Sequence, residues 1–220
     1  MTSSFFNDEY FENMEQSEKV LHCSSDPIVA KFSYDRLNRY LCAAQIQMQR
    51  ITENTMLAVN SKPREPDVSN LESTRKYFKE MQRNYDPIFI DIHFYFISWV
   101  NCQSMMKVLS SLPEFKDAKS YYHSVKKHFD SYGEARNTFE HFHDRLPAGK
   151  FHNKVKEMKE PDSAPRKVYG GLRNGKYLFS DKSWDVTPIS LERLEGFVDG
   201  FLQNINATTN VILSDMAAKA

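Results

Sequence analysis

Apolar residues recur every three to four positions through most of the chain, which is the spacing of one buried face of an α-helix. Three proline-containing sites divide this pattern into segments: KPREPD at residues 62–67, Tyr85-Asp86-Pro87, and Leu112-Pro113. The segments predict helices over residues 33–60, 68–84, 87–112 and 114–146. The third of these is apolar nearly all round, as expected for a central helix of a bundle.

The boundaries of these predicted helices rest on residues that commonly begin or end helices. Ser33 is a suitable N-cap for the first helix. Pro87 follows Tyr-Asp and suits the first position of the third helix, so we expect a break there. Pro147 ends the fourth helix.

The pattern changes in the last third of the chain. Residues 147–165 are polar and rich in Lys, and we interpret them as a basic loop. Residues 166–187 alternate between apolar and polar, and Asn174-Gly175 is a type I′ turn signal, so a small β-hairpin is expected. A C-terminal helix follows over 188–207, with a frayed tail after it.

The chain therefore predicts an all-α fold, a helical bundle of four to five helices with a small β-hairpin inserted before the C-terminal helix. An acidic N-terminal segment, residues 1–30, precedes the bundle of residues 33–146, and its first part can form a short amphipathic helix. At 220 residues with 40% hydrophobic side chains, the chain is expected to form a single domain over 1–220.

Charge and cysteine content argue against several classes of protein. The formal net charge is zero, so the chain lacks the overall basic field of many nucleic-acid-binding proteins, and only a local patch can serve that role. Its three cysteines are far apart and form no CxxC pair, which argues against a disulfide framework or a zinc knuckle. We expect no metal and no cofactor.

The chain shows no sign of membrane insertion or export. The apolar run 87–100 is too short to span a bilayer and is interrupted by Asp91 and His93. The first twenty residues are acidic, whereas a secretory signal begins with positive charge. These features predict a cytoplasmic protein, and we interpret His93 as a hydrogen-bonded core histidine, paired with Asp91 or a backbone group.

The densest group of chemically useful residues is the stretch RNTFEHFHDRL, residues 136–146. On a helix, Arg136 and Glu140 form an i,i+4 pair, and Asn137 and His141 share a face, where the amide can hold one imidazole tautomer. Arg136 and His141 are separated by about 140° around the axis and about 7.5 Å along it, so they flank one groove.

Arg136-Asn-Thr-Phe-Glu-His141 resembles the R-x4-6-H signature of the HEPN superfamily (higher eukaryotes and prokaryotes nucleotide-binding). The resemblance implies a helical bundle, and in many members a metal-independent endoribonuclease that acts as a toxin or in defence. It implies a homodimer that brings two motifs together, with a possible antitoxin or other protein partner. Arg136 and His141 would be the catalytic pair, and Asn137 the polar residue that supports them.

The residue types suit RNA cleavage without a metal. Histidine titrates near neutral pH and can deprotonate a 2′-hydroxyl, and arginine matches the shape and charge of a phosphate. Residues 145–176 contain nine Lys or Arg against three acids, with Tyr169, Tyr177 and Phe179 interleaved. These aromatics can either stack on bases or pack on the core. The candidate RNA-binding residues are Arg145, Lys150, Lys154 and Lys156.

Two other interpretations remain open. The stretch can be an ordinary charged helix flank of a non-catalytic interaction module, whose helices bind a protein partner. Such a module would leave Arg136 and His141 dispersed in surface ion pairs and expose an apolar patch elsewhere. A metal-dependent bundle enzyme would need inward carboxylates on several helices, and the sequence offers few.

Overall fold

The computed structural model describes residues 8–67, 69–140, 168–180 and 182–219, and this part of the chain forms five helices and three strands. The helices are α1 (Asp8–Cys23), α2 (Pro27–Asn60), α3 (Leu71–Ser110), α4 (Lys116–Glu140) and α7 (Pro188–Ala217). The strands are β1 (Val168–Arg173), β2 (Lys176–Ser180) and β3 (Lys182–Asp185). The predicted all-α bundle with a small sheet before the C-terminal helix is confirmed.

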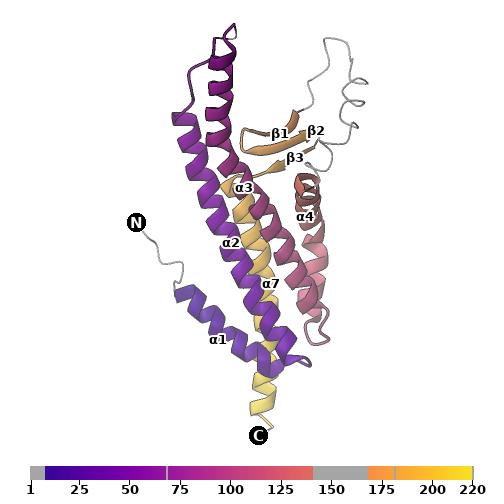
Figure 1. Ribbon diagram of the computed structural model, residues 1–220. Coiled ribbons are helices and arrows are strands. Elements are labelled where there is room, and N and C mark those ends of the chain that lie inside the picture. The colour runs from indigo at the N-terminus through magenta and orange to yellow at the C-terminus, as the bar shows by residue number, and fades with distance from the viewer. Residues whose placement is uncertain (1–7, 68, 141–167, 181, 220) are drawn as a thin grey trace.

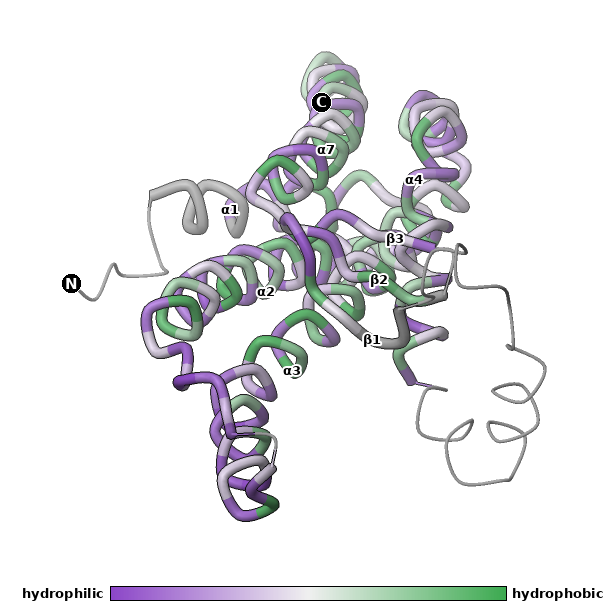
Figure 2. The backbone as a smooth tube through the Cα atoms, turned by 90° about the horizontal axis from the view of Figure 1, so that it is seen from above, coloured by the Kyte–Doolittle hydropathy of each residue, from purple (hydrophilic) through white to green (hydrophobic). Residues whose placement is uncertain are grey.

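Helices α2 and α3 form a long antiparallel pair at the centre (Figure 1). Helix α4 packs beside α3, α7 runs behind the pair, and α1 crosses α2 and α7 near the C-terminal end of the chain. The sheet lies beside α3 at the end of the bundle where α4 finishes. Viewed from above, the hairpin end of α2 and α3 lies apart from α4 and α7 (Figure 2).

The predicted start of α2 at Ser33 is wrong. The helix begins at Pro27, with Asp26 as the N-cap accepting a hydrogen bond from the Val29 amide at 3.3 Å. Proline at the first position loses no intrahelical bond, and an aspartate cap satisfies one of the free amides. Ser33 is buried within the helix instead.

The predicted break at Pro87 is also wrong, because Pro87 lies inside α3, a continuous helix of 40 residues. Proline removes one backbone bond and normally ends or kinks a helix. Here Ile88, Ile92 and Tyr95, which follow the proline at helical spacing, are fully buried. Burial of this apolar face stabilises the continuous helix more than one lost hydrogen bond destabilises it.

The expected hairpin is present as part of a three-stranded antiparallel sheet in the order β1-β2-β3. Asn174 and Gly175 both have positive φ, 50° and 71°, which a type I′ turn requires. The additional strand β3 places Trp184 opposite Tyr177 of β2, and both rings are buried against the helices. This cross-strand aromatic pair explains why the sheet has a third strand.

Helix α7 extends ten residues beyond the predicted end at 207, to Ala217. Thr209 is fully buried there, and its carbonyl lies 3.6 Å from the Cys23 Sγ at the end of α1. The expected frayed tail is therefore wrong, because α1 packs across this part of α7.

A layer of aromatic side chains fills the space between α3, α4 and the sheet. Trp99 lies parallel to Tyr132, with ring centroids 3.8 Å apart, and Phe129 packs edge-on against Trp99. Phe96 contacts Tyr132 and Tyr177, which joins the helices to the sheet. We call Tyr95, Phe96, Trp99, Phe129, Tyr132 and Tyr177 the aromatic layer; all six are buried.

Candidate functional site

The last described turn of α4 carries the first residues of the predicted motif. Apolar residues of α4 face the core at helical spacing, among them Phe129, Tyr132 and Ala135. Arg136 follows directly and lies at the edge of this face, with about a third of its side chain exposed, at 35%. Asn137 is exposed. The helix thus places an arginine and an amide where a solvent-borne ligand can reach them.

Arg136 is held by a carboxylate on its own helix. Its Nε donates to Glu140 Oε2 at 3.2 Å, which is the i,i+4 ion pair expected from the sequence. Both side chains remain about one-third exposed, so water screens their attraction. Such a pair contributes only about 0.2–0.5 kcal/mol, and an incoming anion can displace the carboxylate at little cost.

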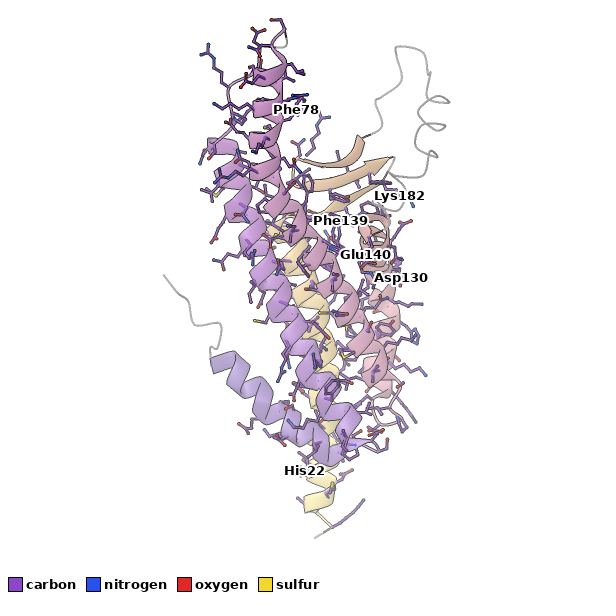
Figure 3. All side chains as sticks on the ribbon, viewed as in Figure 1. His22, Phe78, Asp130, Phe139, Glu140 and Lys182 are labelled. Atoms are coloured by element: carbon purple, nitrogen blue, oxygen red, sulfur yellow. The ribbon has the colours of Figure 1, made fainter. Side chains whose placement is uncertain are left out.

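An imidazole, that of His93 of α3, lies next to the same carboxylate. Its Nε2 is 3.5 Å from Glu140 Oε1, longer than a good hydrogen bond, and its ring stacks on Phe139 with centroids 4.7 Å apart. Figure 3 labels Phe139 and Glu140 at this end of α4. Glu140 therefore lies between Arg136 and His93, and the three side chains form one cluster from two helices.

This position corrects the expectation for His93. Its predicted partner Asp91 is buried on another side of α3, where Arg50 Nε and Asn54 Nδ2 of α2 contact its two oxygens at 3.1 Å each. His93 itself is half-buried rather than a core histidine, with 26% of its side chain exposed. Residues two positions apart on a helix face different directions, so Asp91 and His93 do not pair with each other.

The sequence did not reveal that His93 lies beside Glu140. The two residues are 47 positions apart, and only the packing of α3 against α4 brings them together. No local sequence signal marks this contact, which the structure shows as His93 stacked on Phe139, the residue before Glu140.

Five predicted site residues lie outside the described residues: His141, Arg145, Lys150, Lys154 and Lys156. The predicted pairing of Arg136 with His141, and that of Asn137 with His141, therefore remain predictions. Glu140 is the last described residue before them, so Arg136, Asn137 and Glu140 are the part of the motif whose positions are known.

Two aromatic residues considered for base stacking are not accessible. Tyr177 and Phe179 of β2 are 2% and 9% exposed. Tyr177 packs between Phe89, Phe96 and Phe139. Burial also raises the pKa of Tyr177 to about 12. These side chains attach the sheet to the bundle, and stacking on a base through them is excluded without opening the core.

The described residues also limit other chemistry. No helix in the described part of the chain has an apolar stretch long enough to cross a membrane. Within the same ranges, no group of three or more His, Cys, Asp or Glu side chains is close enough to bind a metal ion. Comparisons of the chain with protein-family models, with curated proteins and with solved structures found no match.

Proposed function

We propose that the protein is a HEPN-like RNA-directed protein, a metal-independent endoribonuclease or a relative that binds RNA or nucleotide in the same place. The observation that carries the proposal is the end of α4. There Arg136 is held only by a weak, partly exposed carboxylate, and Asn137 beside it is exposed. The basic stretch of residues 145–176 follows directly in the sequence.

The proposed reaction needs one base and one cation. His141 removes the proton of the 2′-hydroxyl, whose oxygen attacks the neighbouring phosphorus. The bond from phosphorus to the 5′-oxygen breaks and the leaving oxygen takes a proton from water, which gives a 2′,3′-cyclic phosphate on one product and a 5′-hydroxyl on the other. Arg136 balances the charge that develops on the phosphate oxygens, a role suited to its planar fork of donors.

Glu140 has a defined part in this proposal. Its carboxylate accepts a hydrogen bond from Arg136 when no RNA is present, and a phosphate of the RNA replaces the carboxylate when RNA binds. The displaced carboxylate remains next to His93 Nε2, which can donate a hydrogen bond to it. We further propose that two copies of the chain associate, because a homodimer supplies a second Arg136 and His141 to the same phosphate.

RNA cleavage in EDTA tests the proposal. We expect the wild type to cleave single-stranded RNA with 2′,3′-cyclic phosphate ends, and Arg136→Ala and His141→Ala to lose at least about 100-fold in rate, as for removal of a group that stabilises transition-state charge. Arg75→Ala removes an exposed arginine of α3 and should leave the rate unchanged. Absence of cleavage by folded wild-type protein would reject the nuclease.

Two observations favour a second candidate, a non-catalytic interaction module. Arg136 lies in a partly exposed ion pair, as expected for such a module, and apolar side chains are exposed elsewhere. Asn84 Nδ2 donates to the Ser61 carbonyl at the end of α2, so the 13 residues of α3 before Asn84 lie beyond α2. They extend for about 20 Å, and Leu71 and Phe78 are both 64% exposed on them. Figure 3 labels Phe78 near this projecting end. Exposed apolar side chains on a projecting helix are typical of a protein-binding surface.

The two candidates predict different effects of the same substitution. If the projecting end is the binding surface, the double variant Leu71→Ser with Phe78→Ser should lose the self-association that sedimentation velocity detects for the wild type. In that case no RNA is cleaved. Ile189→Ser, at an exposed apolar residue of α7, serves as the control. Cleavage that survives the double substitution would favour the nuclease.

A further inference from the structure

The contact between the second half of α3 and α4 is hollowed into an open groove of about 500 Å³, lined mainly by residues with polar side chains. Its base includes Ser110 of α3 and Tyr122 of α4, which are 5% and 3% exposed. Lys107, Lys119 and Lys126 line it from both helices. We call this site the α3–α4 groove.

The groove carries a net positive charge, because three lysines and one carboxylate line it. Asp130 is the only carboxylate among its lining residues, and Gln103 Nε2 already donates to Asp130 Oδ1 at 2.7 Å. Within the described ranges, no carboxylate lies within ion-pair distance of Lys107, Lys119 or Lys126. Three amines around one hollow attract a ligand with several negative charges.

The groove and the end of α4 lie along one side of the same helix. Lys119, Lys126, Gly133 and Glu140 follow one another at intervals of seven residues, which keeps them within a narrow stripe. Gly133 has no side chain to block this stripe, and a Cβ built there would meet only Val100 Cγ2, at 3.9 Å. From Lys119 to Arg136 the helix rises about 25 Å and turns by about 100°, so a strand of several nucleotides passes from this stripe to the neighbouring face of α4.

We propose that the α3–α4 groove binds the phosphate backbone of single-stranded RNA, and that Lys107, Lys119 and Lys126 guide the strand along α4 toward Arg136. This inference rests on the proposed function and adds the path by which its substrate is held. Lysine suits the role because its amine contacts phosphates as a point charge, without reading the base. The groove should therefore bind RNA of different sequences with similar affinity.

Binding of a 2′-O-methyl RNA 20-mer, followed by fluorescence anisotropy at several salt concentrations, tests the groove separately from cleavage. This probe lacks the nucleophilic 2′-hydroxyl and cannot be cut. The test variant carries Lys107→Gln, Lys119→Gln and Lys126→Gln. Its matched control carries Lys62→Gln, Lys76→Gln and Lys79→Gln, which remove the same charge from exposed positions around the projecting end of α3.

We expect the groove variant to bind about 100-fold more weakly at 0.1 M salt, with a plot of log K against log salt that is less steep by about 2, as for three lost phosphate contacts. The control should change by less than about threefold. Equal losses in both variants would overturn the inference, because they would show attraction by net charge alone. Binding of a poly-glutamate peptide to the groove in preference to the RNA would overturn it as well.

The groove and the nuclease can fail independently in this design. If the wild type cleaves RNA but the groove variant binds the probe normally, the groove is rejected and the proposed function stands. If the groove variant alone loses probe binding but the wild type cleaves nothing, the nuclease is rejected and the groove stands. No probe binding by the wild type rejects the groove, and the cleavage assay in EDTA then decides the nuclease by itself.

Discussion

Helices α3 and α4 present two different surfaces, an inner one toward the sheet and α7 and an outer one along their shared groove. The inner surface is the aromatic layer, in which every ring is buried and Trp99 and Tyr132 lie in parallel contact. The outer surface is open and lined mainly by residues with polar side chains, and its lysines form no ion pair with a described carboxylate. Stability is thus expected to depend on one side of each helix, which leaves the other side available for a ligand.

The inner surface makes the fold sensitive to alkaline pH. Burial raises the pKa of Tyr132 to about 12, as it does that of Tyr177, and it also raises the pKa of Tyr95. The folded state therefore holds these protons more tightly than the unfolded state, where tyrosine titrates near pH 10. Their stabilising contribution is complete below pH 10 and is lost as pH rises through 12.

Urea unfolding at pH 8, 10 and 11.5 should therefore show a free energy of unfolding that is constant up to about pH 10 and then falls, the largest change expected here. A free energy that stays constant to pH 11.5 would mean that these tyrosines ionise inside the fold without penalty.

Substitution of the central ring gives the next largest effect. Trp99→Ala should lower the free energy of unfolding by about 3–5 kcal/mol, because it leaves a cavity between Phe129 and Tyr132. Phe94→Ala changes an aromatic residue of the same helix that is 49% exposed, and about 1 kcal/mol or less is expected. Similar losses for both, measured by urea unfolding, would contradict the contrast between the two surfaces.

Two glycines of α7 test how closely α4 packs on that side. A Cβ at Gly200 would lie 2.3 Å from Tyr121 Oη, whereas a Cβ at Gly196 would meet no atom within 4 Å. Both alanines gain helix propensity, but only Gly200→Ala displaces the tyrosine, which donates to the Gly196 carbonyl. We expect Gly200→Ala to be less stable than Gly196→Ala by about 1–3 kcal/mol in thermal or urea unfolding.

On the outer surface, small effects on stability should accompany measurable effects on binding. Glu140→Gln should change the free energy of unfolding by about 0.5 kcal/mol or less, because it removes one exposed ion pair. It should also free Arg136 and strengthen RNA binding by about two- to fivefold, equivalent to about 0.5–1 kcal/mol.

The matched control for this substitution is Glu134→Gln, on the same helix, whose carboxylate pairs with Lys182 of β3. RNA affinity that is unchanged in Glu140→Gln, or raised equally in both variants, would mean that Glu140 does not compete with phosphate for Arg136.

The sequence predicted the buried helix faces and the turn better than it predicted where the helices begin and end. Helical spacing identified the apolar face of α4, and Asn174-Gly175 located the turn, because both signals depend on residues close in sequence. The continuous path through Pro87 and the length of α7 depend on contacts with distant elements, which local propensity cannot represent.

The candidate site was predictable to the same extent. The ion pair of Arg136 with Glu140 follows from a spacing of four. His93 beside Glu140, and the α3–α4 groove, both need the register of α3 against α4, which the sequence does not give. Lys107 and Lys119 are twelve positions apart and belong to no sequence motif, and only the packing of α3 against α4 places them on one groove.

The most direct test of where RNA binds is photo-crosslinking with a 2′-O-methyl RNA carrying 4-thiouridine, followed by mass spectrometry of the crosslinked peptides. The account predicts crosslinks to peptides of α4 and the second half of α3, and their loss in the Lys107, Lys119 and Lys126 triple glutamine variant. Crosslinks confined to the projecting end of α3, or distributed equally over the helices, would contradict it.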